Sequence, residues 1–223
     1  MPLAGKGMLL TSMDIDASDE AEFNRWYDRE HLLERVAIEG FLEARRYVAH
    51  EASPKYLSLY STESFDVLDS LAYRAALASQ TDWSKANIAH FKNMIRAVAR
   101  ITVSRGAGRG AALGIVRLRP AGDTDKLRTA LRDQLDPEKL DGILSMRLIE
   151  SDAALSRPIT DDPPVSDPGS GDWFVLIDGT DVKAVSAALA ARLGNSTTFK
   201  PTVISTGVYN LMWDLAKSDI PLP

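Results

Sequence analysis

Apolar and polar positions alternate in short blocks along the 223-residue chain, and the blocks follow the same order twice. An apolar residue at every second position predicts a strand, and apolar residues spaced three and four apart predict a helix. In the first half, strands are predicted at residues 8–15, 41–50, 55–61 and 94–104, with helices at 19–38, 65–78 and 83–91. The order is strand, helix, strand, strand, helix, strand.

The second half repeats this order with little sequence identity to the first. Strands are predicted at residues 111–118, 142–150, 173–178 and 201–213, with helices at 123–135 and 181–193. A glycine-rich segment at 105–110 joins the halves, so we expect domains at residues 1–106 and 107–223. The proline-rich segment 156–171 is expected to be a long loop, either mobile or functional as a lid.

The repeated element order predicts an α+β fold of two ferredoxin-like units, each with helices on one face of an antiparallel sheet. The other face of each sheet needs cover, and pairing the two sheets face to face provides it. We therefore expect a barrel-type core with the helices outside, closed within the chain or between chains. A homodimer is expected, with a monomer as the alternative because a fused repeat can pair its own sheets.

The helix at residues 19–38 carries most of the candidate chemistry. At about 100° per residue, one arc of it should face the sheet. That arc comprises Phe23, Trp26, Tyr27, Leu33, Ala37 and Ile38. Glu30 falls near the middle of the arc and His31 at its edge, whereas Leu32 and Arg35 lie elsewhere. A buried carboxylate is costly unless it is paired, protonated or beside a wet cavity, so Glu30 and His31 are candidate acid–base groups.

A purely structural interpretation of these two residues is also open. Glu30 would pair with Arg45 or Arg46 on the following strand, and His31 would only complete the packing. Strand alternation places Arg45 and Tyr47 on one face of that strand and Arg46 on the other.

Further aromatic and polar side chains are candidates for holding a ligand, with ordinary packing as the alternative for each. The candidate ligand-binding residues are Trp26, Arg46, Tyr47, Tyr60, Trp83, Asn87 and His90. Three of them, Trp83, Asn87 and His90, share one stripe of the helix predicted at residues 83–91.

Composition narrows the function classes. The formal net charge is −5 with no long basic run, which argues against a nucleic-acid partner. The chain has no cysteine and only three histidines, far apart, so neither disulfides nor a metal site are expected. No apolar run approaches the ~18 residues that span a bilayer, and the first residues lack a signal-peptide core, so a cytoplasmic protein without a membrane partner is expected. No flavin, nicotinamide or haem motif is present, and no cofactor is expected.

Four short segments resemble the dimeric α/β-barrel superfamily, and most closely its EthD-like and stress-responsive members. They are Trp-Tyr-Asp-Arg-Glu-His at 26–31, Gly-Phe at 40–41, Arg-Arg-Tyr at 45–47 and Lys-Tyr-Leu-Ser-Leu-Tyr at 55–60. The resemblance covers residues 8–104. The second half is similar in element order only, because its first helix, at 123–135, has no such motif.

The resemblance implies a cavity between helices and sheet that receives small, often aromatic molecules. Relatives include lactone isomerases, polyketide cyclases, cofactor-free monooxygenases and haem-degrading enzymes, and in several a histidine matching His31 contributes to the site. We therefore predict a cofactor-independent enzyme that acts on a small aromatic or cyclic carbonyl compound by proton transfer, as an isomerase, cyclase or lyase. Its catalytic residues would be His31, Glu30 and Tyr27. A non-catalytic binding or stress-associated protein and a cofactor-free monooxygenase are the alternatives, since fold does not settle function.

Overall fold

The computed structural model describes residues 5–157, 169–192 and 202–220. The elements of the first half are β1 (Gly7–Asp14), α1 (Glu20–Trp26), a π-helix (Tyr27–His31), α2 (Leu32–Ala37), β2 (Phe41–Glu51), β3 (Tyr56–Thr62), a 3₁₀-helix (Phe65–Asp69), α3 (Leu71–Ala78), α4 (Asp82–Ile88) and β4 (Lys92–Gly106). Those of the second half are β5 (Ala112–Leu118), α5 (Thr124–Gln134), β6 (Ile143–Ser151), β7 (Trp173–Gly179), α6 (Val182–Arg192), β8 (Val203–Ala216) and a 3₁₀-helix (Lys217–Asp219).

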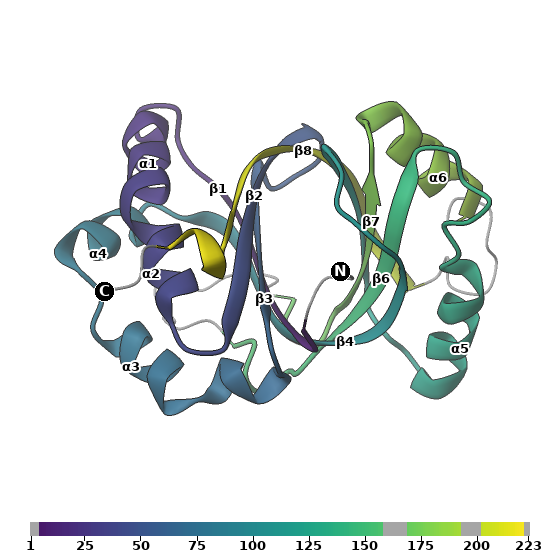
Figure 1. Ribbon diagram of the computed structural model, residues 1–223, viewed down its shortest axis with the longest axis horizontal. Helices are drawn as coiled ribbons and strands as arrows, with labels where there is room; N and C mark the ends of the chain where they lie inside the picture. Colours follow the sequence, from purple (N-terminus) through teal and green to yellow (C-terminus); the bar gives the residue numbers. More distant parts are fainter. Residues whose placement is uncertain (1–4, 158–168, 193–201, 221–223) are drawn as a thin grey trace.

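The eight strands close into one antiparallel barrel in the order β1-β3-β2-β8-β5-β7-β6-β4. The strands of each half are neighbours, and the two sheets join edge to edge at β2–β8 and β4–β6. Helices α1 to α4 cover one side of the barrel, and α5 and α6 cover the opposite side (Figure 1). The predicted α+β fold of two ferredoxin-like units is thus confirmed, and the barrel closes within one chain. The homodimer and the division at residue 106 stay predictions.

The period-two pattern of the strands sorts their side chains between two faces of the sheet. On β3, Leu57 and Leu59 join the apolar cluster inside the barrel, whereas Tyr56 and Tyr60 join the cluster beneath the helices. Strand side chains point alternately to opposite faces, so each strand serves the barrel interior and a helix layer at once. A third cluster lies between the second-half sheet and its helices.

The helix predicted at residues 19–38 forms, but it contains a π-helical turn that the sequence pattern did not reveal. The N–H of Leu32 donates to a carbonyl oxygen five residues earlier. One extra residue in a turn rotates everything after it by about 100° relative to a regular helix. Leu33 and Ala37, predicted to face the sheet, are therefore exposed, whereas Leu32 and Arg35, predicted to lie elsewhere, are buried.

Other boundaries differ in smaller ways. The helix predicted at 65–78 is divided at Ser70, whose side chain caps α3 by accepting from the backbone N–H of Tyr73. Strand β4 runs on to Gly106, so the linker is shorter than predicted. Most of the loop predicted at 156–171 falls outside the described residues.

Across the described ranges of the chain, no helix is both long and apolar enough to cross a membrane.

Candidate functional site

The candidate site lies between the first-half sheet and the π-helix. The π-helix places His31 next to Tyr27, with ring centroids 4.9 Å apart, and 6.3 Å from the Tyr60 ring on β3. The Trp26 ring also packs against His31, at 4.3 Å, and lies 4.9 Å from the Tyr27 ring. Trp26, Tyr27 and Tyr60 are buried, whereas His31 is partly exposed. Four of the sequence-predicted site residues therefore meet in one aromatic box, with His31 as its polar member.

Several polar atoms in and beside this box are buried without a protein partner. His31 Nδ1, the Tyr60 hydroxyl and Arg35 Nε and Nη1 find no hydrogen bond among the described residues. Buried polar groups are almost always hydrogen-bonded, and leaving one unsatisfied costs about 1–3 kcal/mol. These atoms are therefore the ones from which a bound polar molecule gains most.

The protonation states of His31 and Tyr60 are set mainly by burial. Burial, followed by the positive charges of Arg35 and Arg46, holds the pKa of His31 well below its ordinary value of 6.5. Burial, followed by the nearby Tyr27 phenol, holds the pKa of Tyr60 well above 10.0. At neutral pH, His31 is an uncharged proton acceptor and Tyr60 is a hydrogen-bond donor.

The lowered pKa of His31 predicts a pH dependence of stability. Below pH 6.5 the unfolded chain binds a proton at this histidine and the folded chain does not, so stability falls as the pH drops towards the folded pKa. The contribution has a limiting slope of about 1.4 kcal/mol per pH unit. Urea unfolding at several pH values between about 5 and 7, the range where a histidine of the unfolded chain titrates, should give a flatter profile for His31→Gln than for the wild type. Parallel profiles would contradict the assignment.

Glu30 lies beside the aromatic box but is already engaged. Its Oε1 accepts hydrogen bonds from Trp26 Nε1 at 3.2 Å, Thr81 Oγ1 at 2.6 Å and Ser84 Oγ at 3.1 Å. Thr81 also caps α4 by accepting from the backbone N–H of Ser84. Glu30 thus ties the π-helix to the start of α4, and its catalytic role stays a prediction.

The structural alternative for Glu30, a pair with Arg45 or Arg46, is wrong because both arginines bind other carboxylates. Arg46 is fully buried beneath α1, where it donates to Asp28 Oδ1 at 3.0 Å and Asn24 Oδ1 at 2.6 Å. Its guanidinium carbon lies 4.2 Å from the centre of the Tyr27 ring. Arg46 therefore supports the helix and places a positive charge under the site.

The remaining predicted ligand-binding residues lie apart from His31 or are held by the protein. Tyr47 lies inside the barrel, on the other face of β2. Trp83 donates its indole N–H to a carboxylate of α1, and Asn87 donates to the backbone carbonyl of Trp83. His90 is exposed and paired with Asp19 at 2.6 Å. Their ligand contacts stay predictions.

Sequence reasoning missed Arg35 and a polar cluster inside the barrel. Arg35 is buried on α2 because the π-helical turn rotates that helix, and its positive charge acts on His31 and Tyr60. The cluster contains Glu43, Arg45, Arg147 and Asp178, all nearly fully buried. The sequence does contain a signal for one member of this cluster. Arg147 is a charged residue in the otherwise apolar strand β6, at a position that faces the barrel interior.

No family model and no curated protein matches the chain. Solved structures do match, at low identity. An anthrone oxidase-like protein is 10% identical with a TM-score of 0.65, over 98% of this chain and 96% of its own. A "putative monooxygenase" from Lactobacillus acidophilus NCFM is 10% identical with a TM-score of 0.57, over 95% and 97%.

A second "putative monooxygenase", from Fusobacterium nucleatum, is also 10% identical, with a TM-score of 0.54 over 94% of this chain and 92% of that one. Likeness at this identity shows the fold alone, and the closer kinship with EthD-like proteins stays a prediction. The chain has the eight-stranded dimeric α/β-barrel fold, with both halves of the barrel supplied by one polypeptide.

Proposed function

We propose that the protein is a cofactor-independent enzyme that moves a proton on a small aromatic or cyclic carbonyl compound. The substrate would bind between the π-helix and strand β3, beside His31. The observation that carries the proposal is a set of buried polar atoms without a hydrogen-bond partner in the described part of the chain: His31 Nδ1, the Tyr60 hydroxyl and two nitrogens of Arg35. A base and two donors of this kind are what the removal of a proton next to a carbonyl group requires.

The residues would have distinct roles. His31, uncharged at neutral pH, accepts the proton from the carbon next to the carbonyl group, and the electron pair of the C–H bond moves onto the carbonyl oxygen. The Tyr60 hydroxyl and the Arg35 guanidinium donate hydrogen bonds to that developing oxyanion. His31 then returns the proton to the same or another carbon, which gives exchange, isomerisation or ring closure.

The aromatic rings around His31 support a flat, largely apolar substrate. Trp26 and Tyr27 pack against His31 with centroid distances of 4.3 and 4.9 Å. Aromatic side chains favour ring stacking and edge contacts with aromatic ligands. Arg46 adds a buried positive charge that favours an anionic intermediate.

A second candidate is a cofactor-free oxygenase, which would begin with the same proton transfer. Two of the similar structures are described as monooxygenases and one as anthrone oxidase-like, which supports this reading. Anthrone plus O₂ gives anthraquinone plus water, so the carbanion formed at His31 would be oxidised by O₂ instead of being reprotonated.

Anthrone, a tricyclic ketone with an acidic methylene group, is a suitable first probe for both reactions. In D₂O under nitrogen, mass spectrometry should show deuterium entering the methylene group faster with the protein than without it. His31→Gln should lower the accelerated rate by at least about 100-fold, because general-base catalysis contributes roughly 10²- to 10⁴-fold. Production of anthraquinone in air, above the uncatalysed rate, would select the oxygenase.

Tyr60→Phe is the matched variant, since it removes only the unpartnered hydroxyl. It should lower the exchange rate less than His31→Gln does. In the wild type and in Tyr60→Phe, the exchange rate should fall at low pH, where His31 becomes protonated. In His31→Gln, this fall at low pH should be absent. If the wild type binds anthrone without accelerating its exchange or its oxidation, a non-catalytic binding protein is the better conclusion.

A further inference from the structure

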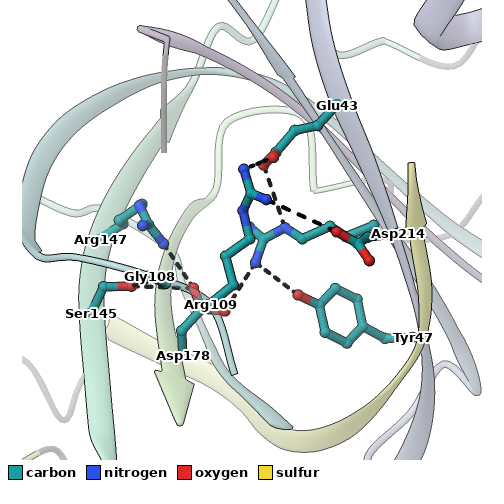
Figure 2. A network of polar contacts seen from close by, with 9 residues as sticks. Glu43, Tyr47, Gly108, Arg109, Ser145, Arg147, Asp178 and Asp214 are labelled. Carbon is teal, nitrogen blue, oxygen red and sulfur yellow. Dashed lines mark hydrogen bonds and ion pairs between the residues drawn. The ribbon is translucent and has the colours of Figure 1, made fainter. Parts of the chain in front are cut away.

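A second group of unpartnered polar atoms lies inside the barrel, on the face of the sheet away from His31. Arg147 on β6 and Arg45 on β2 approach from opposite walls, and Asp178 on β7 lies between them. Figure 2 shows Arg147, Asp178 and Tyr47 directed towards one another. Arg45, Arg147 and Asp178 are at most 1% exposed. A charged cluster this deep needs every hydrogen bond that it can form.

Asp178 satisfies only part of the two guanidiniums. Its Oδ1 accepts from Arg45 Nη1 at 2.9 Å, and its Oδ2 accepts from Arg147 Nη1 at 2.7 Å. Arg45 Nη1 also donates to the Tyr47 hydroxyl at 2.9 Å. Three buried guanidinium nitrogens remain without a partner among the described residues: Arg45 Nη2 and Arg147 Nε and Nη2.

The free atoms of Arg147 form one complete edge of its guanidinium. Nε–H and one N–H of Nη2 point in the same direction, which is the arrangement that accepts two oxygens of a carboxylate or phosphate side by side. Arg147 is fully buried, so leaving this edge unsatisfied is costly. The geometry of the two N–H donors on this edge therefore matches an oxyanion, which would satisfy both of them.

The charges around the cluster balance one another. Glu43, the second buried carboxylate, is shared between Arg45 Nε at 3.6 Å and Arg109 of the linker. Arg109 lies 3.9 Å from Asp214, which is half-exposed. The buried part of the cluster thus has two guanidiniums, of Arg45 and Arg147, and two carboxylates, of Glu43 and Asp178. Arg109 and Asp214 add one charge of each sign nearer the surface. The buried N–H donors without a partner, and not an excess of positive charge, are what favours an oxyanion.

The linker between β4 and β5 closes this end of the barrel. Ser145, beside Asp178, donates to the carbonyl oxygen of Gly108 at 3.0 Å, and the neighbouring Arg109 reaches Glu43 (Figure 2). Gly108 and Arg109 are exposed on their outer side, so the cluster lies directly beneath a surface segment.

We propose that the interior of the barrel binds a small oxyanion, of the carboxylate or phosphate type, on the Nε–Nη2 edge of Arg147. Arg45 Nη2 supplies further positive charge and an N–H donor in the same cluster. The site is separate from the one around His31, because the two lie on opposite faces of the sheet, and it does not depend on the proposed proton transfer.

Titrations with sodium acetate and sodium phosphate, against sodium chloride at equal ionic strength, test the proposal. The ¹⁵N–¹H signal of Arg147 Nε, identified by its loss in Arg147→Lys, should shift saturably with acetate or phosphate and not with chloride. Arg147→Lys keeps the charge but not the planar edge, so the midpoint of thermal unfolding should respond to the oxyanion at a concentration at least about tenfold higher. Arg132→Lys is the matched control, because Arg132 is exposed, and it should respond as the wild type does. The anion that binds more tightly, acetate or phosphate, identifies the type of ligand.

Equal responses to chloride and to both oxyanions would overturn the proposal, as would a response that Arg147→Lys retains in full. If Arg147→Lys does not fold, wild-type crystals grown in acetate and in chloride replace it. Planar density within hydrogen-bond distance of Nε and Nη2 in acetate crystals alone supports the site. Water molecules at this edge in both crystals would refute it.

Discussion

Replacing Asp178 by asparagine is expected to lower the free energy of unfolding by about 3–5 kcal/mol. Asp178 is fully buried, and its two oxygens bind Arg45 at 2.9 Å and Arg147 at 2.7 Å. Asparagine keeps the shape but not the charge, so two buried guanidiniums lose their common counter-ion. An uncompensated buried charge costs far more than a broken surface pair. Urea denaturation followed by circular dichroism measures the loss.

Asp125→Asn is the matched control, because Asp125 also pairs with an arginine, Arg128, but is exposed. It should cost less than about 1 kcal/mol. A loss as small for Asp178→Asn would show that the cluster does not depend on its charge. Replacing Asp178 by leucine together with both arginines by methionine should recover much of the stability, since apolar residues of similar volume often replace a buried ion cluster without loss.

Neighbouring residues of strand β2 contribute to both the cluster inside the barrel and the site around His31. Arg45 and Tyr47 point into the barrel, whereas Arg46 lies beneath α1. A slip of β2 by one residue would exchange the two faces and bury Arg46 beside Arg147. The polar residues of this strand therefore help to fix its register.

The sequence pattern was sufficient for the strands, the repeat and the barrel. Alternation in residues 41–50 and 55–61 separates the two faces of β2 and β3 correctly, including Arg45 from Arg46. Because each sheet has one face that its helices do not cover, the need to bury that face predicts that the two halves pair. This argument uses only periodicity and burial, which are local properties of the chain.

The π-helical turn and the contacts across the barrel could not be predicted in this way. A π-helical turn adds one residue to a turn without a sequence signature of its own. The regular spacing of about 100° per residue therefore assigned Arg35 to the wrong face of the helix. Arg45 and Asp178 are 133 residues apart, and their contact depends on the register of the closed barrel. Within the candidate site, Trp26, Tyr27 and Tyr60 do lie around His31, but only the structure shows which of their polar atoms have no partner.

Trp26→Ala is expected to lower the free energy of unfolding by about 3–5 kcal/mol, the usual cost of truncating a fully buried tryptophan. Trp26 is 0% exposed, and its indole N–H donates to Glu30 at 3.2 Å and Ser84 at 3.1 Å. The truncation leaves a large void between α1 and α4 and removes the ring that packs against His31. Thermal and urea unfolding measure the loss.

Two further variants separate packing from hydrogen bonding. Trp26→Phe keeps most of the ring volume and loses the indole donor and the second ring, so it should cost about 1–2 kcal/mol. Trp83→Ala is the control in the same helix layer, because Trp83 is partly exposed and makes one hydrogen bond to Glu22. A loss for Trp26→Ala no greater than that for Trp83→Ala would mean that the Trp26 ring is not part of the core. His31 would then lack the rigid wall that its role as a positioned base requires, and the proposed proton transfer would lose its structural support.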